Sequence, residues 1–122
     1  MKKILVVDDV ELVRKYFRTI IEQALGFEFL EAQNPLEAFE ILENTKPDLI
    51  ILDMEMPVMD GFSALVKIRN NEATKALPVI VCSALSSSSL FESLVKLNIS
   101  DYIVKPSSAE LIIEKIKKAL FI

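Results

Sequence analysis

The chain alternates short, continuous apolar runs with longer segments in which apolar residues recur at helical spacing. The runs are rich in β-branched residues and bounded by polar ones, which is typical of strands buried on both faces. The run at 27–32 is the most polar of them, so we expect it to be an edge strand. The five predicted strands span residues 4–7, 27–32, 49–52, 78–83 and 101–104.

Helical periodicity and capping residues predict a helix after each strand. The first spans about residues 10–25, and Gly26 stands where a C-cap glycine belongs. The second begins at Asn34, with Glu37 completing a capping box, and ends near residue 44. The predicted apolar face of the first helix comprises Val13, Phe17, Ile20, Ile21 and Ala24.

Polar residues mark the starts of the other three helices. The third helix is expected to begin near Ser63, and the serine run at 86–89 predicts the loop and cap that open the fourth. Ser107 and Glu110 have the spacing of a capping box for the last helix, which ends near the C-terminus.

This alternation predicts the α/β fold class. Strands that are each followed by a helix form a parallel sheet covered on both faces, because right-handed crossovers place the helices on either side. We expect a doubly wound, five-stranded parallel sheet in the flavodoxin-like order 2-1-3-4-5, within a three-layer α/β/α sandwich. A chain of 122 residues is one domain's worth, so residues 1–122 are predicted to form a single domain.

Composition narrows the function. The chain has no histidine, which excludes Ser-His and Cys-His nucleophile pairs. The single cysteine, Cys82, lies in an apolar run and is expected to be a buried, inert thiol. A net charge of −4 argues against direct nucleic-acid binding. No apolar run is long enough to cross a membrane, and ILVV after Met-Lys-Lys is too short for a secretory signal, so we expect a cytoplasmic protein.

The candidate chemistry lies where the predicted strands end. The apolar run 49–52 leads directly into a carboxylate, although an unpaired charge is costly to bury. Polar residues also follow three other strands, which are contiguous with it in the order 2-1-3-4-5. These residues should therefore converge on one pocket. They are Asp8, Asp9, Asp53, Ser83 and Lys105.

Three carboxylates in one pocket repel each other unless a cation neutralises them. Mg²⁺ suits such a site, because it binds through one or two carboxylates and leaves positions for phosphate oxygens. Lys105 can reach an anion, and Ser83 adds a hydroxyl donor. The set is typical of a phosphoryl-transfer site in which a carboxylate is the nucleophile.

With these residues in place, the whole chain resembles a bacterial response-regulator receiver domain of the chemotaxis type. The resemblance rests on Asp8-Asp9, on Asp53 followed by MPVMDG after one intervening Met-Glu pair, on Ser83 and on Lys105-Pro106, all in order. It implies a two-component signalling switch that promotes its own phosphorylation and dephosphorylation, rather than an enzyme. The implied partners are a histidine kinase or histidine phosphotransfer protein and a downstream protein or output domain.

The resemblance also implies residue roles. Asp53 would be the phosphoacceptor, and Lys105, Ser83 and backbone amides near Met54 and Ala84 would hold the phosphoryl group. Tyr102 would act with Ser83 as the conformational switch, and the Lys105-Pro106 bond would be cis. The implied ligands of Mg²⁺, or of Mn²⁺, are Asp8, Asp9, Asp53 and the backbone carbonyl of Glu55.

Each residue also has a simpler interpretation. Asp8 and Asp9 could be acids that favour a helix N-terminus, and Tyr102 an ordinary strand aromatic. Met54, Met56 and Met59 are more typical of loop packing than of a partner surface. It is the joint occurrence of the polar residues at the strand ends that favours the phosphoacceptor site.

The chain departs from the family pattern in three ways. Ser83 stands where threonine is common, which keeps the hydroxyl and loses a methyl group. Asn98 stands where many relatives have glycine, and asparagine tolerates a left-handed backbone. Glu55 and Leu85 occupy the two variable positions that, by the resemblance, tune the lifetime of the phosphoryl group.

Three rival functions remain. A haloacid-dehalogenase-like phosphatase also ends a strand in a nucleophilic aspartate, but it wants a second aspartate where this chain has Glu55. A flavodoxin needs a glycine- and hydroxyl-rich loop after the first strand, and DDVELVRKY has no glycine. A degenerate receiver that serves only as a binding scaffold is at odds with the intact acidic set.

Overall fold

The structure is a computed structural model that describes residues 1–56, 58–84 and 88–122, including all side chains in these ranges except those of residues 88 and 89. The strands are Lys3–Val7 (β1), Glu28–Ala32 (β2), Leu49–Asp53 (β3), Val79–Ser83 (β4) and Asp101–Val104 (β5). The helices are Glu11–Arg18 (α1), Pro35–Asn44 (α2), Gly61–Arg69 (α3), Ser88–Val95 (α4) and Ala109–Ala119 (α5). A π-helical segment, Thr19–Ala24 (η1), continues α1.

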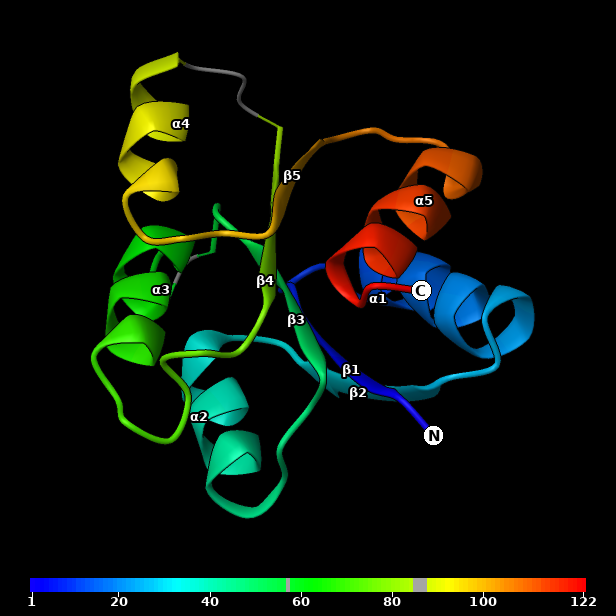
Figure 1. The fold of residues 1–122 in the computed structure, drawn as a ribbon, viewed down its shortest axis with the longest axis horizontal. Coiled ribbons are helices and arrows are strands. Elements are labelled where there is room, and N and C mark those ends of the chain that lie inside the picture. The colour runs from blue at the N-terminus through cyan, green and yellow to red at the C-terminus, as the bar shows by residue number, and fades with distance from the viewer. Residues whose placement is uncertain (57, 85–87) are drawn as a thin grey trace.

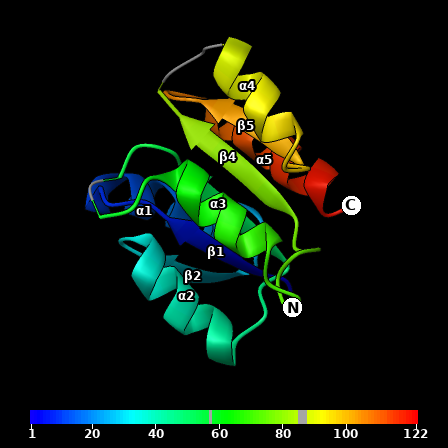
Figure 2. The ribbon, with the colours of Figure 1, turned by 90° about the vertical axis from the view of Figure 1, so that its left-hand side faces the viewer.

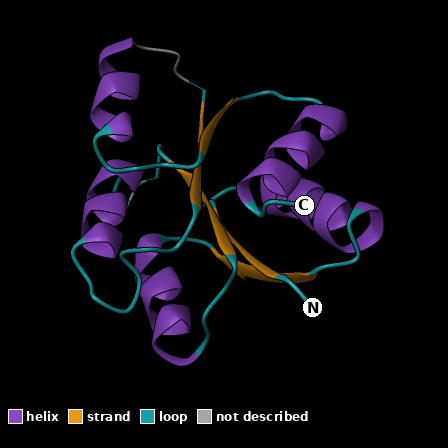
Figure 3. Cartoon of the chain, viewed as in Figure 1, coloured by secondary structure: helices purple, strands orange, loops and turns teal. Residues whose placement is uncertain are grey.

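The strands form one parallel sheet in the order β2-β1-β3-β4-β5. Helices α1 and α5 cover one face, and α2, α3 and α4 cover the other (Figure 1). Figure 3 shows the resulting three layers, with the strands between two groups of helices. The predicted fold class and strand order are confirmed, and the polar strand β2 lies at an edge as expected.

The sheet has a separate apolar core on each face. Because successive strand residues point to opposite sides, Ile4 and Val6 pack toward α1 and α5, whereas Leu5 and Val7 pack toward the other helices. Side chains of this kind each contribute about 1.5–3 kcal/mol when fully buried. Both faces of the central strands are therefore buried in apolar cores.

The first helix is shorter than its apolar pattern predicted. It is α-helical only to Arg18 and continues as η1, in which the Leu25 N–H donates to the Ile20 carbonyl, five residues back. The wider turn moves Ala24 off the buried face, and Ala24 is exposed. The expected C-cap glycine is confirmed, since Gly26 has φ of +68°. Asn98, with φ of +57°, also has a left-handed backbone, which asparagine tolerates.

Two helix starts differ from the predicted ones. Helix α3 begins at Gly61 because the Asp60 carboxylate accepts a hydrogen bond from the Ser63 N–H at 2.8 Å. Helix α5 is capped by Ser108, whose hydroxyl accepts from the Leu111 N–H, and not by Ser107 with Glu110. The Ser107 hydroxyl instead donates to the Val104 carbonyl at 2.7 Å.

The predicted cap of α2 is confirmed. The Asn34 side chain accepts from the Glu37 N–H at 2.9 Å, and the Glu37 carboxylate reaches back to the Gln33 N–H. The prediction for the serine run at 86–89 lies outside the described residues, apart from the helical backbone at 88 and 89. Over the described residues, no helix combines the length and apolar character needed to cross a membrane.

Candidate functional site

The five polar residues singled out in the sequence lie at the carboxyl ends of the strands. Asp8 and Asp9 follow β1, Asp53 and Ser83 end β3 and β4, and Lys105 follows β5. The strands are parallel, and Figure 2 shows the arrows of β1, β4 and β5 pointing toward the same side of the molecule. The carboxyl ends of contiguous strands thus bring these residues together, as the strand order predicted.

Lys105 joins the two most buried acids. Its Nζ donates to Asp8 Oδ2 and to Asp53 Oδ1, each at 3.0 Å. Asp8 and Asp53 are each only 2% exposed, whereas Asp9 is exposed. One ammonium therefore balances two buried carboxylates, which leaves an excess of negative charge at the site.

The electrostatics of Asp53 reflect this excess. Burial and the negative charge of Asp8 raise the pKa of Asp53 to about 6, although Lys105 acts in the opposite direction. Burial alone would lower the pKa of Lys105, but its hydrogen bonds to the two carboxylates outweigh burial and raise it. The lysine is therefore charged at neutral pH, and Asp53 remains ionised there at an energetic cost.

The acidic residues fit a hard divalent cation. Asp8, Asp9 and Asp53 each offer a carboxylate oxygen, and these oxygens lie within 4.8 Å of one another. Asp8 Oδ1 also accepts from the Val10 N–H at 2.9 Å, which orients the carboxylate. An all-oxygen donor set with uncompensated charge matches the preference of Mg²⁺.

Arg14 supports this cluster and was missed in the sequence. Its guanidinium donates to the Asp8 carbonyl at 2.6 Å and pairs with Glu31 at 2.7 Å. It therefore ties the turn after β1 to strand β2. Its position in the first turns of α1 was the only available signal, and a surface arginine would look the same in the sequence.

The hydrogen bonds of the Glu55 carboxylate are a second feature that sequence reasoning missed. It accepts from the Ser83 hydroxyl at 2.8 Å and from the Ala84 N–H at 2.9 Å. The Glu55 N–H itself donates to Asp53 Oδ1 at 3.3 Å. By the resemblance, Glu55 would give its backbone carbonyl to the metal site and occupies a position that tunes the phosphoryl lifetime. The structure adds that its carboxylate links the loop after β3 to the end of β4.

The methionines of the loop after β3 pack into the core. Met54 and Met56 are buried and Met59 packs against the same core, which confirms the loop-packing interpretation of these residues. Gly61 is essential to this loop. A Cβ atom there would lie 2.2 Å from the Asp53 carbonyl oxygen and 2.6 Å from Met54 Cα.

Three other sequence expectations concern β4 and β5. Cys82 is buried, and burial raises the pKa of its thiol to about 12, so it is a protonated packing group as expected. The Lys105-Pro106 peptide bond is cis. Tyr102 is half-buried, and its ring packs edge-on against Phe91 of α4 at a centroid distance of 6.0 Å.

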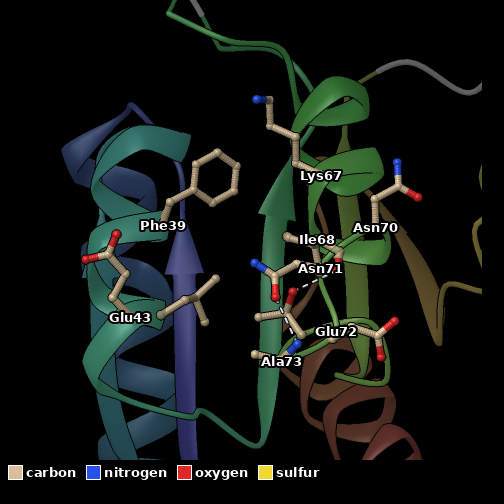
Figure 4. A pocket seen from close by; sticks show the side chains of 10 residues that line it. Phe39, Glu43, Lys67, Ile68, Asn70, Asn71, Glu72 and Ala73 are labelled. Atoms are coloured by element: carbon tan, nitrogen blue, oxygen red, sulfur yellow. Dashed lines mark hydrogen bonds between the residues drawn. The ribbon is translucent and has the colours of Figure 1, made fainter.

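The acidic site is distinct from the groove between α2 and α3. That groove has a volume of about 750 Å³ and is lined by Phe39, Glu43 and Lys67 among others (Figure 4). None of the strand-end residues lines it. The candidate functional site thus lies at the carboxyl ends of the strands.

Comparison with known proteins agrees with this geometry. The family model described as "Response regulator receiver domain" matches residues 4–117. The chain is 37% identical over 120 residues to "Chemotaxis protein CheY" of Listeria monocytogenes, covering 98% of each chain. It is 36% identical to the protein of the same name from Bacillus subtilis, covering 97% of each.

Solved structures and longer relatives extend the comparison. The chemotaxis response regulator CheY4 of Vibrio cholerae has a TM-score of 0.90 and 27% identity, with 98% of this chain and 99% of that one covered. The chain is also 41% identical to a protein-glutamate methylesterase/protein-glutamine glutaminase of Rhodospirillum rubrum, but over only 28% of that protein.

The chain belongs to the response regulator receiver domain family. It is a receiver domain of the CheY type, a phosphoaccepting switch of two-component signalling. The family resemblance inferred from the strand-end residues is confirmed.

Proposed function

We propose that residues 1–122 form a single receiver domain that accepts a phosphoryl group on Asp53 from a phosphohistidine protein in a Mg²⁺-dependent reaction. The observation that carries this proposal is the placement of the Asp53 carboxylate, which ends β3 among two other acids and the Lys105 ammonium. A carboxylate can attack phosphorus to give an aspartyl phosphate.

The proposed transfer balances without further reactants. An Asp53 oxygen forms the new bond to phosphorus as the bond from phosphorus to the donor imidazole nitrogen breaks. The nitrogen keeps the electron pair and takes up a proton. Lys105, Ser83 and the backbone amides near Met54 and Ala84 then donate to the phosphoryl oxygens, so the chain acts by positioning and charge stabilisation.

The metal would be held by Asp8, Asp9, Asp53 and the backbone carbonyl of Glu55, and Mn²⁺ could replace Mg²⁺. When bound, the cation offsets the negative charge that gathers as the phosphoryl group approaches the carboxylates. The three clustered carboxylate oxygens and the raised pKa of Asp53 support this assignment.

Magnesium is expected to stabilise the fold. At ten times its dissociation constant, a ligand of the native state contributes about 1.4 kcal/mol, which raises the melting temperature of a domain of this size by about 4–6 °C. Thermal melts of the wild type and of Asp9→Ala with increasing Mg²⁺ test this. The shift should be strongly reduced in Asp9→Ala and kept in Glu43→Gln, an exposed control on α2. Equal shifts in all three proteins would rule out the assigned ligands.

The proposed role is that of a switch, not of an enzyme acting on an external substrate. Incubation with acetyl phosphate and Mg²⁺, followed by intact-mass measurement, separates this role from its rivals. A persistent increase of about 80 Da, the mass of one phosphoryl group, supports a receiver. Continued phosphate release without an adduct would favour a haloacid-dehalogenase-like phosphatase. If the protein showed no adduct and released no phosphate, a binding scaffold would be favoured.

The proposed partners follow from the chemistry of the chain. Because it has no histidine, it cannot itself carry the phosphohistidine donor, which we assign to a sensor histidine kinase or a histidine phosphotransfer protein. The names of its CheY relatives support a role in chemotaxis-type signalling. The proposed location of the domain is the cytoplasm. Neither nucleic acid nor a membrane is a proposed partner of this domain. Transfer from purified phosphohistidine proteins tests the scheme, and self-phosphorylation from ATP would overturn it.

The proposed output uses Ser83 and Tyr102. A phosphoryl group on Asp53 would draw the Ser83 hydroxyl toward its oxygens, and Tyr102 would move into the space that is released. The edge-on contact of Tyr102 with Phe91 supports a route from β5 to α4. A downstream protein or output domain would then bind the face made by α4, β5 and α5.

A further inference from the structure

The carboxylate of Glu55 is held by both of its oxygens. Oε2 accepts from the Ser83 hydroxyl at 2.8 Å, and Oε1 accepts from the Ala84 N–H at 2.9 Å. Ser83 is fully buried, whereas Glu55 is an exposed residue that reaches it from the loop after β3. An anion thus already lies on these donors, at the end of β4.

The same donors belong to the phosphoryl site of the proposed function. A backbone N–H and a hydroxyl each carry a single hydrogen, so each makes one strong hydrogen bond at a time. A phosphoryl group on Asp53 and the Glu55 carboxylate therefore compete for the same two hydrogens. Two anions in this position would also repel each other.

We propose that Glu55 is an internal occupant of the phosphoryl-binding donors, and that phosphorylation displaces its carboxylate from Ser83 and Ala84. This inference rests on the proposed function of Asp53 as phosphoacceptor. The exposed side chain of Glu55 can turn into water when displaced. It therefore opposes phosphoryl binding by competition and determines how strongly the site holds its ligand.

Displacement also changes a contact between two loops. In the unphosphorylated domain, Glu55 ties the loop after β3 to the start of the loop after β4 across 28 residues of sequence. A phosphoryl group on Asp53 would accept the hydrogen bonds of Ser83 and Ala84 in place of Glu55, which would then be released. The exchange frees the loop after β3 at the moment when Ser83 moves, so the two events are coupled.

The test is a titration with beryllofluoride, used as a phosphoryl mimic, in the presence of Mg²⁺. Binding is followed by the amide NMR signal of Ala84 in the wild type, Glu55→Ala, Glu55→Asp and Glu92→Ala. Glu55→Asp keeps the charge but is one methylene too short to span both donors. Glu92→Ala removes an equal charge from the exposed surface of α4 and is the control for net charge.

Glu55→Ala is expected to lower the half-saturating concentration about tenfold, as for the loss of one competing charge-assisted hydrogen bond. Glu55→Asp should also lower the half-saturating concentration, and Glu92→Ala should have the same half-saturating concentration as the wild type. In the ligand-free proteins, the Ala84 amide signal should move upfield on Glu55→Ala, since it loses its carboxylate acceptor.

The outcomes separate this inference from the proposed function. If the wild type fails to bind beryllofluoride, or if Asp53→Asn binds it equally well, the phosphoacceptor assignment is wrong. If the wild type binds and Glu55→Asp behaves like the wild type, occupancy of the donors is not what limits binding, and the inference is overturned. An Ala84 amide signal that is unchanged in ligand-free Glu55→Ala would also overturn it.

Discussion

Asp53→Asn is expected to lower phosphorylation by acetyl phosphate at least about a hundredfold, because the amide is nearly isosteric with the carboxylate but is not a nucleophile. Its oxygen can still accept the hydrogen bond that Lys105 donates to Asp53 Oδ1. The fold should therefore survive while the chemistry is lost. Intact-mass measurement over time and thermal melting report the two effects separately.

The sign of the stability change follows from the pKa of Asp53. A carboxyl whose pKa rises from 3.8 to about 6 on folding costs stability as the pH rises through this interval, and the cost persists above pH 6. In the absence of divalent cations at pH 7, removal of this charge should leave the melting temperature unchanged or raise it. Asp60→Asn is a matched control, because asparagine can replace Asp60 as the N-cap of α3. This variant should be phosphorylated to the same extent as the wild type. Equal labelling of Asp53→Asn and Asp60→Asn would show that Asp53 is not the acceptor.

Gly61→Ala is expected to destabilise the domain by at least about 3 kcal/mol, at the upper end of what overpacking costs. The new Cβ would lie 2.2 Å from the Asp53 carbonyl oxygen and 2.6 Å from Met54 Cα, and backbone atoms cannot move aside cheaply. The shift would also disturb the Gly61 N–H that donates to the Met54 carbonyl at 3.0 Å. Urea unfolding at equilibrium measures the loss.

Gly26→Ala is the matched control for that substitution. Its Cβ would meet no atom within 4 Å, and only the left-handed backbone at φ of +68° opposes it. The expected cost is about 1–2 kcal/mol. Similar free energies of unfolding for the two variants would mean that the turn before α3 can relax, and that Gly61 does not hold the loop after β3 against the site.

The sequence alone predicted that Asp53, Asp8 and Lys105 lie close together, because the carboxyl ends of parallel strands all lie at the same end of the sheet. Once five strands and their order are known, the residue after each strand has a defined place. The burial of Cys82 follows equally directly from its place in a continuous apolar run.

The remaining details depend on choices between nearly equal local alternatives. Ser107 and Ser108 both suit a helix cap. The Ser107 hydroxyl donates to the Val104 carbonyl instead, and Ser108 caps α5. The π-helical turn after Arg18 has no local signal in the apolar pattern. The Glu55 carboxylate could not be placed either, because its donors, Ser83 and Ala84, are brought to it only by the paired strands.

The most direct test of the central claim locates the phosphoryl group within the chain. Wild-type protein labelled with acetyl phosphate and Mg²⁺ is digested, and the peptide that carries the added mass is fragmented in the mass spectrometer. The proposed function predicts that the adduct lies on Asp53. An adduct on Asp8, Asp9 or Glu55, or on the Ser83 hydroxyl, would contradict it.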